Sequence, residues 1–284
     1  MRTRTIKNEI ELLEQYNRLA HAMEEVSVLK MTDIRDVVLS SREYQDGLID
    51  VFADIRSSNE KEMKVAMQKA YQVKKNKRAI ILFSANSRMY GTITDEVFTK
   101  CMADVLNTDD DLIIVGKIGK ELYETNGYTK PFQYYDLPDY DITFIDLLPI
   151  LGYVVEYKTV RVYYGRFENM FTQLATVTDI TGDSIIETQE TTQRQELFIT
   201  EPSADELYSF YTGQILSIIF KQTAYEFELA RHASRIKTLE ESLQHAENNK
   251  KNQEKLLNRI MKLEQDKKQQ SKLSYIWAKK RYEQ

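Results

Sequence analysis

The sequence predicts an α/β fold in which long N- and C-terminal helices form an antiparallel coiled coil and a small, mostly parallel α/β domain is inserted between them. Two observations lead to this prediction. No glycine or proline lies before Gly47 or after Gly213, so neither end of the chain contains a helix breaker. The four prolines all fall between Pro131 and Pro202, in a middle segment where the apolar pattern changes from helical to strand-like.

The first predicted element is a helix over residues 1–56. Its apolar positions advance by three or four residues, as in a coiled coil, with one polar position. The stripe consists of Ile6, Ile10, Leu13, Asn17, Ala20, Met23 and Val26, and continues through Ile34, Val37, Val38, Leu48, Val51, Phe52 and Ile55. At ~1.5 Å per residue this helix is about 75 Å long, which is more than a domain of this size needs for its own core.

The middle of the chain alternates between strands and helices. Residues 57–77 are polar and predict a linker or short helix, and residues 78–202 predict the α/β domain. We expect strands at 78–84, 111–116, 132–135, 160–164 and 174–180, with 197–200 as a further candidate. We expect helices at 94–106, with Thr94 as its cap, at 117–125, and at 143–152, where Pro149 interrupts the helix. This order implies right-handed crossovers and a parallel sheet, with an antiparallel edge where the later strands follow one another.

The last predicted element is a helix over residues 203–284. A heptad-like register runs through it and holds even where the residues become polar. Its members are Ile236, Leu239, Leu243, Ala246, Lys250, Gln253, Leu257 and Ile260. Some 80 residues at ~1.5 Å each would span about 120 Å. The two terminal helices can therefore pair only if they run antiparallel and the longer one extends past the shorter one.

Composition excludes several classes of protein. The single cysteine, Cys101, rules out an internal disulfide and a cysteine cluster for zinc or iron–sulfur. His21, His232 and His245 are too scattered in the sequence to predict a metal site. The longest apolar runs are far below the ~18 residues that a membrane span needs, and the arginines at the N-terminus are not followed by the apolar run of a secretory signal. We therefore expect a cytoplasmic protein without metal, cofactor or direct membrane insertion.

Charge is distributed unevenly along the chain. Residues 249–284 carry eleven Lys and Arg against four Asp and Glu, which is +7, whereas the remainder carries −12. This basic segment has no recognisable nucleic-acid-binding module and no interleaved aromatic residues, so we expect no nucleic acid among the partners. An acidic protein partner fits better, because complementary charge steers association.

No catalytic constellation emerges from the sequence. Gly116-Lys117 and Gly119-Lys120 follow a predicted strand, but the spacing of a phosphate loop and of a dinucleotide fingerprint is absent. There is no G-x-S-x-G motif, and Cys101 is best explained as a small buried thiol. Residues 134–141 are acidic and aromatic, and we interpret them as a solvated surface loop, with a contact surface as the alternative. The sequence thus predicts neither catalytic nor cofactor-binding residues.

The arrangement of long helix, small α/β domain and longer helix is similar to the gamma subunit of F-type ATP synthases. Residues 22–31 (AMEEVSVLKM) resemble that family's A-M-x-M-V-[SA]-x-x-K-[LM] segment, and residues 80–91 (IILFSANSRMYG) resemble its first strand and S-D-R-G-L-C-G turn. Asn248-Asn249 and Lys268-Gln269 resemble its N-A and R-Q pairs. The turn keeps Arg88 and Gly91 but lacks the Asp, the first Gly and the Cys, so the chain resembles a divergent member from an F-like ATPase.

The resemblance implies a non-enzymatic rotor shaft with a Rossmann-like domain, which couples rotation to ATP synthesis or hydrolysis in partner subunits. The expected partners are alpha- and beta-type nucleotide-binding subunits, with an epsilon-type subunit and a membrane ring as further candidates. It places the complex on the inner face of the cell membrane. The residues expected to contact partners are Met23, Lys30, Arg88, Gln269, Ile276 and Trp277. The alternatives are a coiled-coil scaffold or adaptor with an α/β docking domain, and an enzyme whose site leaves no sequence signature.

Overall fold

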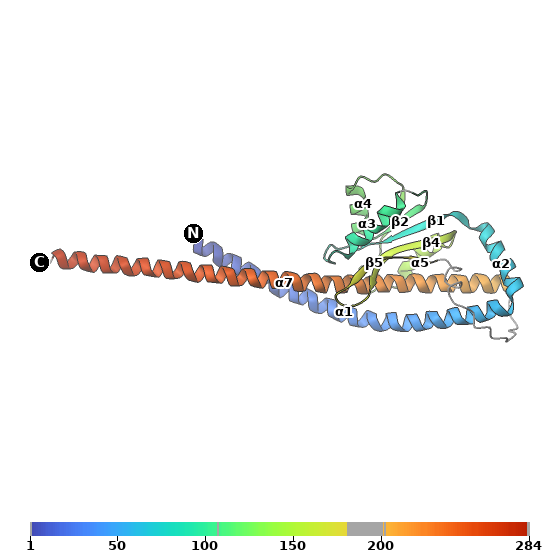
Figure 1. Cartoon of the computed structure of the whole chain (residues 1–284), viewed down its shortest axis with the longest axis horizontal. Helices are drawn as coiled ribbons and strands as arrows, with labels where there is room; N and C mark the ends of the chain where they lie inside the picture. The colour runs from blue at the N-terminus through green and yellow to red at the C-terminus, as the bar shows by residue number, and fades with distance from the viewer. Residues whose placement is uncertain (1, 107, 181–200, 202, 283–284) are drawn as a thin grey trace. The chain divides into compact units, whose positions relative to one another are not determined.

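A computed structural model describes residues 2–106, 108–180, 201 and 203–282 of the chain (Figure 1). Its contacts group the chain into two compact units. The first unit contains Met1–Val26 and Thr238–Gln284, and the second contains Ser27–Lys237. Helices α1 and α7 contribute to both units, because α1 spans Arg2–Ser58 and α7 spans Ala204–Tyr282.

The second unit is built on a five-stranded sheet in the order β3-β2-β1-β4-β5. Its strands are β1 (Lys75–Phe83), β2 (Asp111–Val115), β3 (Phe132–Tyr135), β4 (Tyr157–Phe167) and β5 (Gln173–Asp179). The first four are parallel to their neighbours, and β5 pairs antiparallel with β4. The remaining helices of this unit are α2 (Glu60–Val73), α3 (Ile93–Val105), α4 (Lys117–Thr125) and α5 (Phe144–Val154). The predicted parallel sheet with an antiparallel edge is confirmed.

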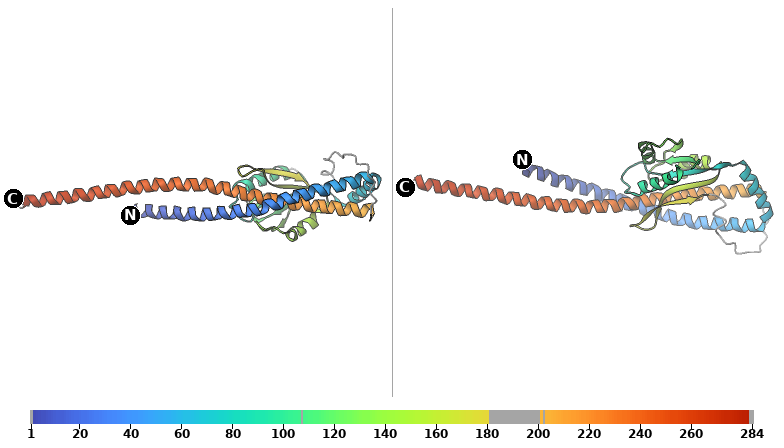
Figure 2. Two further views of the ribbon diagram at one scale, coloured as in Figure 1. Left: turned by 90° about the horizontal axis from the view of Figure 1, so that it is seen from below. Right: turned by 45° about the horizontal axis from the view of Figure 1, so that its top comes forward.

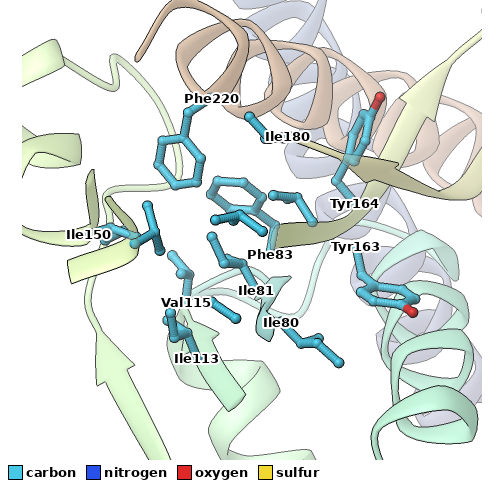
Figure 3. Packing of buried hydrophobic residues seen from close by; sticks show 14 of the residues in the cluster. Ile80, Ile81, Phe83, Ile113, Val115, Ile150, Tyr163, Tyr164, Ile180 and Phe220 are labelled. Atoms are coloured by element: carbon cyan, nitrogen blue, oxygen red, sulfur yellow. The ribbon is translucent and has the colours of Figure 1, made fainter. Parts of the chain in front are cut away.

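Strand β1 alternates its side chains between two helical layers. Helices α3 and α4 cover one face of the sheet, and α5 and α7 cover the other (Figure 1). Ile81 and Phe83 point to the second face, where the Phe83 ring lies 5.4 Å from Phe220 of α7 (Figure 3). Ile80 points to the first face, as does Tyr163 of β4, which bonds Asp104 of α3. Because both faces are covered, β1 is a continuous apolar run rather than an alternating one.

Several predicted element ends differ from the observed ones. Helix α3 begins at Ile93 rather than at Thr94, so Thr94 is not the cap but lies buried in the first turn. The buried Ile93 explains the shift, since it anchors that turn to the core. Strand β4 is longer than predicted because it pairs with a strand on each side. The candidate strand at 197–200 lies outside the described residues.

Helix α5 runs through Pro149 without a break, so the interruption predicted at this proline is wrong. A capping box fixes its start: Thr143 Oγ1 and the Thr143 backbone N–H both donate to Asp146 Oδ2, at 2.6 and 2.9 Å. Asp146 also places a negative charge at the positive end of the helix dipole. These contacts secure the point at which the loop after β3 enters α5.

In the first unit, the beginning of α1 and the end of α7 lie side by side and run in opposite directions (Figure 2). Three contacts between the helices show the opposite directions, because the residue number falls on α1 as it rises on α7. They join Ala20 with Leu243, Glu14 with Lys250 (2.8 Å), and Thr3 with Glu264 (3.3 Å). Helix α7 then continues past this last contact to Tyr282. The predicted antiparallel pairing, with the longer helix extending past the shorter one, is confirmed.

In the second unit, α1 and α7 pair again and join the core. Ile34 and Val38 of α1 pack against Leu229, and the Phe52 ring stacks on Tyr211 at 5.2 Å. Not all of the predicted stripe is covered, however. Val37 (43%) and Val51 (49%) are exposed in this unit, as is Val26 (54%) in the first unit. Val37 and Val51 each precede a buried residue by one position, and one position turns the side chain about 100° away from the narrow seam that α7 covers.

Candidate functional site

In open α/β sheets, ligands bind beyond the carboxyl ends of the parallel strands, near the point where the strand order reverses. In this chain that region lies beyond β1, between its neighbours β2 and β4. The segments that meet there are the loop 84–92 after β1, Gly116 after β2 and the loop 136–143 after β3. We call this region the carboxyl-end cluster, and its contacts decide whether the fold has room for a ligand.

Arg231 of α7 fills the centre of the carboxyl-end cluster. It is only 2% exposed, and its Nη1 lies 2.9 Å from Asp139 Oδ1. Its Nη2 donates to the Asp139 carbonyl, also at 2.9 Å. The guanidinium lies 4.7 Å from the centroid of the Phe227 ring. A buried charge needs this kind of compensation, because desolvation costs several kcal/mol per ion.

The carboxylate of Asp139 also binds the loop after β1. Its Oδ1 accepts the backbone N–H of Asn86 at 2.7 Å, and its Oδ2 accepts the Ser87 hydroxyl at 3.0 Å. Asp139 is 8% exposed. The interpretation of residues 134–141 as a solvated loop is therefore wrong at this position, because Arg231 and two donors of loop 84–92 replace the water that would solvate the carboxylate.

The start of α4, where a phosphate would bind in a nucleotide-binding fold, is occupied by the chain itself. Asn86 Oδ1 accepts the Lys117 N–H at 2.8 Å, and the Ala85 carbonyl accepts the Ile118 N–H at 2.8 Å. Gly116 has φ +96°, and a Cβ there would lie 2.8 Å from the Ser84 carbonyl oxygen. Two of the backbone donors that an anion would need are therefore already bonded within the chain.

A second polar group joins α1, α7 and the loop after β3. Lys30 Nζ lies 2.6 and 2.7 Å from the carboxylate oxygens of Asp141, and Glu228 Oε1 accepts the Asp141 backbone N–H at 3.0 Å. We call these three residues the Glu228 junction. The hydrogen bond to Asp141 raises the pKa of Lys30, and burial raises the pKa of Glu228 to about 7.

Aromatic and cationic side chains also gather around the next turn of α7, at His232 and Arg235. The Arg235 guanidinium lies 3.9 Å from the centroid of the Tyr90 ring, and Arg235 Nε donates to the Met89 carbonyl at 2.8 Å. His232 is 1% exposed, and its ring nitrogens find no hydrogen-bond partner among the described residues. Burial, with nearby arginines, lowers the pKa of His232 to about 4. This histidine is therefore neutral at physiological pH.

The structure places the expected partner contacts in different parts of the chain. In the first unit, Met23 packs against the Ala20–Leu243 contact, and Gln269 is exposed on α7. The side chains of Ile276 and Trp277 lie outside what the structure describes, although both residues belong to α7.

In the second unit, the expected contacts Lys30 and Arg88 bind different carboxylates. Lys30 pairs with Asp141, whereas Arg88 is exposed and pairs with Glu121 at 2.8 Å. The described members of the set thus do not form a single site. Arg88 and Gln269 are exposed, whereas Met23 packs into the seam between α1 and α7 and Lys30 is half-buried in its ion pair.

Sequence reasoning missed Arg231, Glu228 and the burial of Asp139. One signal was available for Arg231. Phe220, Ala224 and Phe227 recur at helical spacing on the face of α7 that covers the sheet, and Arg231 occupies the next position of that stripe. A charged residue on an apolar stripe predicts a buried partner of opposite charge, but the sequence does not say which aspartate supplies it.

No group of three or more His, Cys, Asp or Glu among the described residues is placed to hold a metal ion. Within the same residues, no helix has an apolar stretch long enough to cross a membrane. What the described residues build at the usual ligand-binding edge is a closed, internally bonded cluster.

Comparison with known proteins gives consistent results along the whole chain. A family model described as "ATP synthase" matches residues 2–265. The ATP synthase gamma chain of Malacoplasma penetrans is 23% identical over 281 residues, which covers 95% of this chain and 93% of that relative. The ATP synthase gamma chain of Roseiflexus castenholzii is 22% identical over 245 residues, which covers 82% and 83%.

Solved structures show the same fold. A chain in the OSCP/F1/c-ring structure of the Euglena gracilis mitochondrial ATP synthase matches with a TM-score of 0.62 at 14% identity, over 96% of this chain and 94% of that one. A chain in the central stalk/c-ring structure of the Tetrahymena thermophila mitochondrial ATP synthase matches with a TM-score of 0.57 at 13% identity, over 79% and 99%.

Proposed function

Because this chain belongs to the ATP synthase gamma family, we propose that it is the non-catalytic central rotor shaft of an F-type ATPase. The match of the family model to residues 2–265 is the observation that carries the proposal. The structure supports it with two long helices that pair antiparallel, since paired helices supply the stiffness that a rotating shaft needs. In this role the chain couples rotation to ATP synthesis or hydrolysis that takes place in partner subunits.

The carboxyl-end cluster supports a mechanical role for the α/β fold. Arg231 and Asp139 occupy the place where a related fold would hold a nucleotide, and Asn86 already binds the start of α4. The loop after β3 is thus bonded to α7, the longer helix of the shaft, through a buried ion pair, and Asp139 also binds the loop after β1. These contacts attach the α/β fold to α7 without a ligand, as a mechanical role requires.

We propose that the segments of the chain divide this work. Residues 1–56 and 203–284 form the shaft, residues 57–77 connect it, and residues 78–202 form the α/β domain. Torque arises when an asymmetric shaft meets successive catalytic subunits, each of which switches between discrete conformations. This division predicts that partner contacts lie along the shaft as well as on the α/β domain.

The proposed partners are alpha- and beta-type nucleotide-binding subunits, contacted by the shaft and by the turn after β1. The proposed contact residues are Met23, Lys30, Arg88, Gln269, Ile276 and Trp277. In the first unit α1 also exposes apolar side chains on a side that α7 does not cover: Leu12 (63%), Tyr16 (43%) and Leu19 (60%). Such a stripe fits a surface that a protein partner covers. An epsilon-type subunit and a membrane ring are further proposed partners, with the complex on the inner face of the cell membrane.

Co-purification from the native source tests the proposal. An affinity tag at the C-terminus could obstruct the shaft, so we would insert it after Gly127, a positive-φ glycine with no atoms within 4 Å of the position of a Cβ. We expect the tagged chain to bring down two larger subunits that bind nucleotides, in a complex that hydrolyses ATP. A stable homodimer with no nucleotide-binding partner would contradict the proposal and favour a scaffold.

Lys30 can be tested as a partner contact with a matched pair of variants. Lys30→Glu reverses a charge on the surface of α1 and also breaks the ion pair with Asp141. Asp141→Asn weakens the same ion pair but leaves the α1 surface as it is. If Lys30 contacts a catalytic subunit, Lys30→Glu lowers the ATP turnover of the assembled complex much more than Asp141→Asn does. Equal effects would show that Lys30 acts only within its own chain.

A further inference from the structure

The Glu228 junction holds a strained residue in place from two sides. Asp141 has φ +57°, a left-handed backbone conformation that residues other than glycine seldom adopt. Its N–H is fixed by Glu228 of α7, and its carboxylate is fixed by Lys30 of α1. Backbone strain of this kind persists only where surrounding contacts over-determine it. The junction is therefore the point at which loop 136–143 is attached to both long helices within the second unit.

Glu228 is buried without a cation of its own. It is 1% exposed, and the charged groups that face it come from each element packed around it. Arg231 on its own helix already pairs with Asp139, and Lys30 on α1 already pairs with Asp141. The loop contributes the Asp141 carboxylate, which repels a second negative charge. An ionised Glu228 would thus be a buried carboxylate that its neighbours compensate only in part, which is costly.

We propose that Glu228 is a proton switch that sets how firmly α1 and α7 hold the loop after β3. With a proton on Oε2, the side chain is neutral, stays buried and accepts the Asp141 N–H through Oε1. When the proton leaves for solvent, the buried charge favours states in which Glu228 reaches water, and the loop is released more often. The proposal concerns this chain alone and does not depend on the function proposed above.

The titration of Glu228 falls in the range where such a switch is useful. Burial raises the pKa of Glu228 from 4.5 to about 7, although Arg231, the hydrogen bond from the Asp141 N–H and Lys30 all act in the opposite direction. Because the closed junction binds the proton more tightly than the open one, protonation stabilises closure fully below pH 4.5, and this stabilisation is lost as the pH rises through about 7. The pKa of His232 is lowered to about 4, so this neighbour stays neutral across the same interval.

Amide hydrogen exchange of the full chain tests the switch. If opening exposes Glu228, the Asp141 amide, which donates to Glu228, loses its acceptor. Its protection factor, corrected for intrinsic exchange, should fall about tenfold between pH 6 and pH 8. Glu228→Gln keeps the acceptor oxygen and removes the titration, so its protection should be the same at both pH values. Glu226→Gln alters another buried glutamate of α7 and should retain the tenfold fall, which makes it the matched control.

Lys30→Gln provides a second test of the switch, which can be read even if the Glu228→Gln variant does not fold. Lys30 favours the ionised form of Glu228, so Lys30→Gln should move the midpoint of the pH dependence to a higher pH. A merely structural role for Lys30 would lower protection at every pH and leave the midpoint in place. The proposal is overturned if Glu228→Gln shows the same pH dependence as the unmodified chain, or if Lys30→Gln leaves the midpoint unchanged.

Discussion

The contacts of Arg231 argue against the binding of a phosphate or nucleotide at the carboxyl ends of the strands. A helical arginine in the place of a ligand supplies the positive charge that a phosphate would seek, but Asp139 already neutralises it at 2.9 Å. Removing one partner of a buried pair leaves the other charge unpaired, which costs more than the pair itself contributes. The carboxyl-end cluster should therefore respond far more strongly to substitution than the ion pairs on the surface.

We predict that Arg231→Met lowers the free energy of unfolding of the isolated chain by about 3–5 kcal/mol, as measured by urea denaturation. The matched control is Arg88→Met, which makes the same change in an exposed ion pair with Glu121. This control should leave the stability of the isolated chain nearly unchanged, because exposed pairs contribute little. Equal losses for the two variants would mean that Arg231 is not buried as the structure has it.

His232 gives the chain a sensitivity to acid. The pKa of His232 is lowered to about 4 in the folded chain, against 6.5 for an unperturbed histidine. The unfolded state therefore takes up a proton first, and stability is lost as the pH falls from about 6.5 towards 4.

We predict that His232→Leu, compared with its parent, stabilises the chain by about 2 kcal/mol more at pH 5 than at pH 7.5. Both proteins should carry Glu228→Gln, because the ionisation of the neighbouring Glu228 changes stability with pH in the opposite direction. Urea denaturation at the two pH values is the measurement. A gain that does not depend on pH would show that His232 has the same pKa in the folded and unfolded chain, as a solvated histidine would.

At the scale of the elements, polar residues interrupt the seam between α1 and α7 in the first unit. Asn17 and Gln253 each bury a side-chain oxygen that finds no hydrogen-bond partner among the described residues. Lys250 occupies a seam position as well and reaches out to Glu14 at 2.8 Å. An unpaired buried acceptor costs stability, whereas an apolar group at the same place does not. The pairing of the two helices is therefore weaker than their length allows.

We predict that Asn17→Leu raises the free energy of unfolding by about 1 kcal/mol, measured by urea denaturation followed by helical circular dichroism. Leu19→Asn is the control, because Leu19 is 60% exposed on the same helix and its substitution should have little effect on the isolated chain. If Asn17→Leu destabilises the chain instead, the Asn17 amide is satisfied by contacts that hold the seam together.

The end of α7 can be tested through the only tryptophan of the chain, Trp277. The family predicts an apolar sleeve of catalytic subunits around this end, and burying a large apolar side chain there is worth roughly 1.5–3 kcal/mol. Tryptophan emission should shift to the blue when catalytic subunits are added to the isolated chain. Removal of residues 277–284 should weaken assembly without abolishing rotation. Emission that stays at the solvated position in an active complex would contradict this prediction.

The elements with the strongest periodicity were the ones that the sequence could predict. The seam of α7 from Ile236 to Ile260 is more buried than its flanks, including its polar members, and β3 and α4 lie where the pattern placed them. Exposure of Val37 and Val51 could not be predicted, because apolar spacing does not show how wide a face the partner covers. The burial of Asp139 depends on Arg231, which is far away in sequence, and no local pattern reports such a contact.

At the scale of the whole molecule, the chain has features that suit a subunit bound by partner proteins. Its sheet is closed by its own helix, its α1 exposes an apolar stripe, and its long helices exceed what its core requires. These features suit a part that transmits force between partners. The central claim is therefore that this chain turns when its partners hydrolyse ATP.

Single-molecule rotation tests that claim most directly. Cys101 is fully buried and burial raises the pKa of its thiol, so a cysteine introduced by Ile145→Cys, at a position that is 74% exposed, can be labelled selectively. With the catalytic subunits fixed to a surface and a bead attached at position 145, we predict unidirectional rotation that requires ATP and stops when ATP is withdrawn. A complex that hydrolyses ATP while the bead shows only Brownian motion would contradict the account.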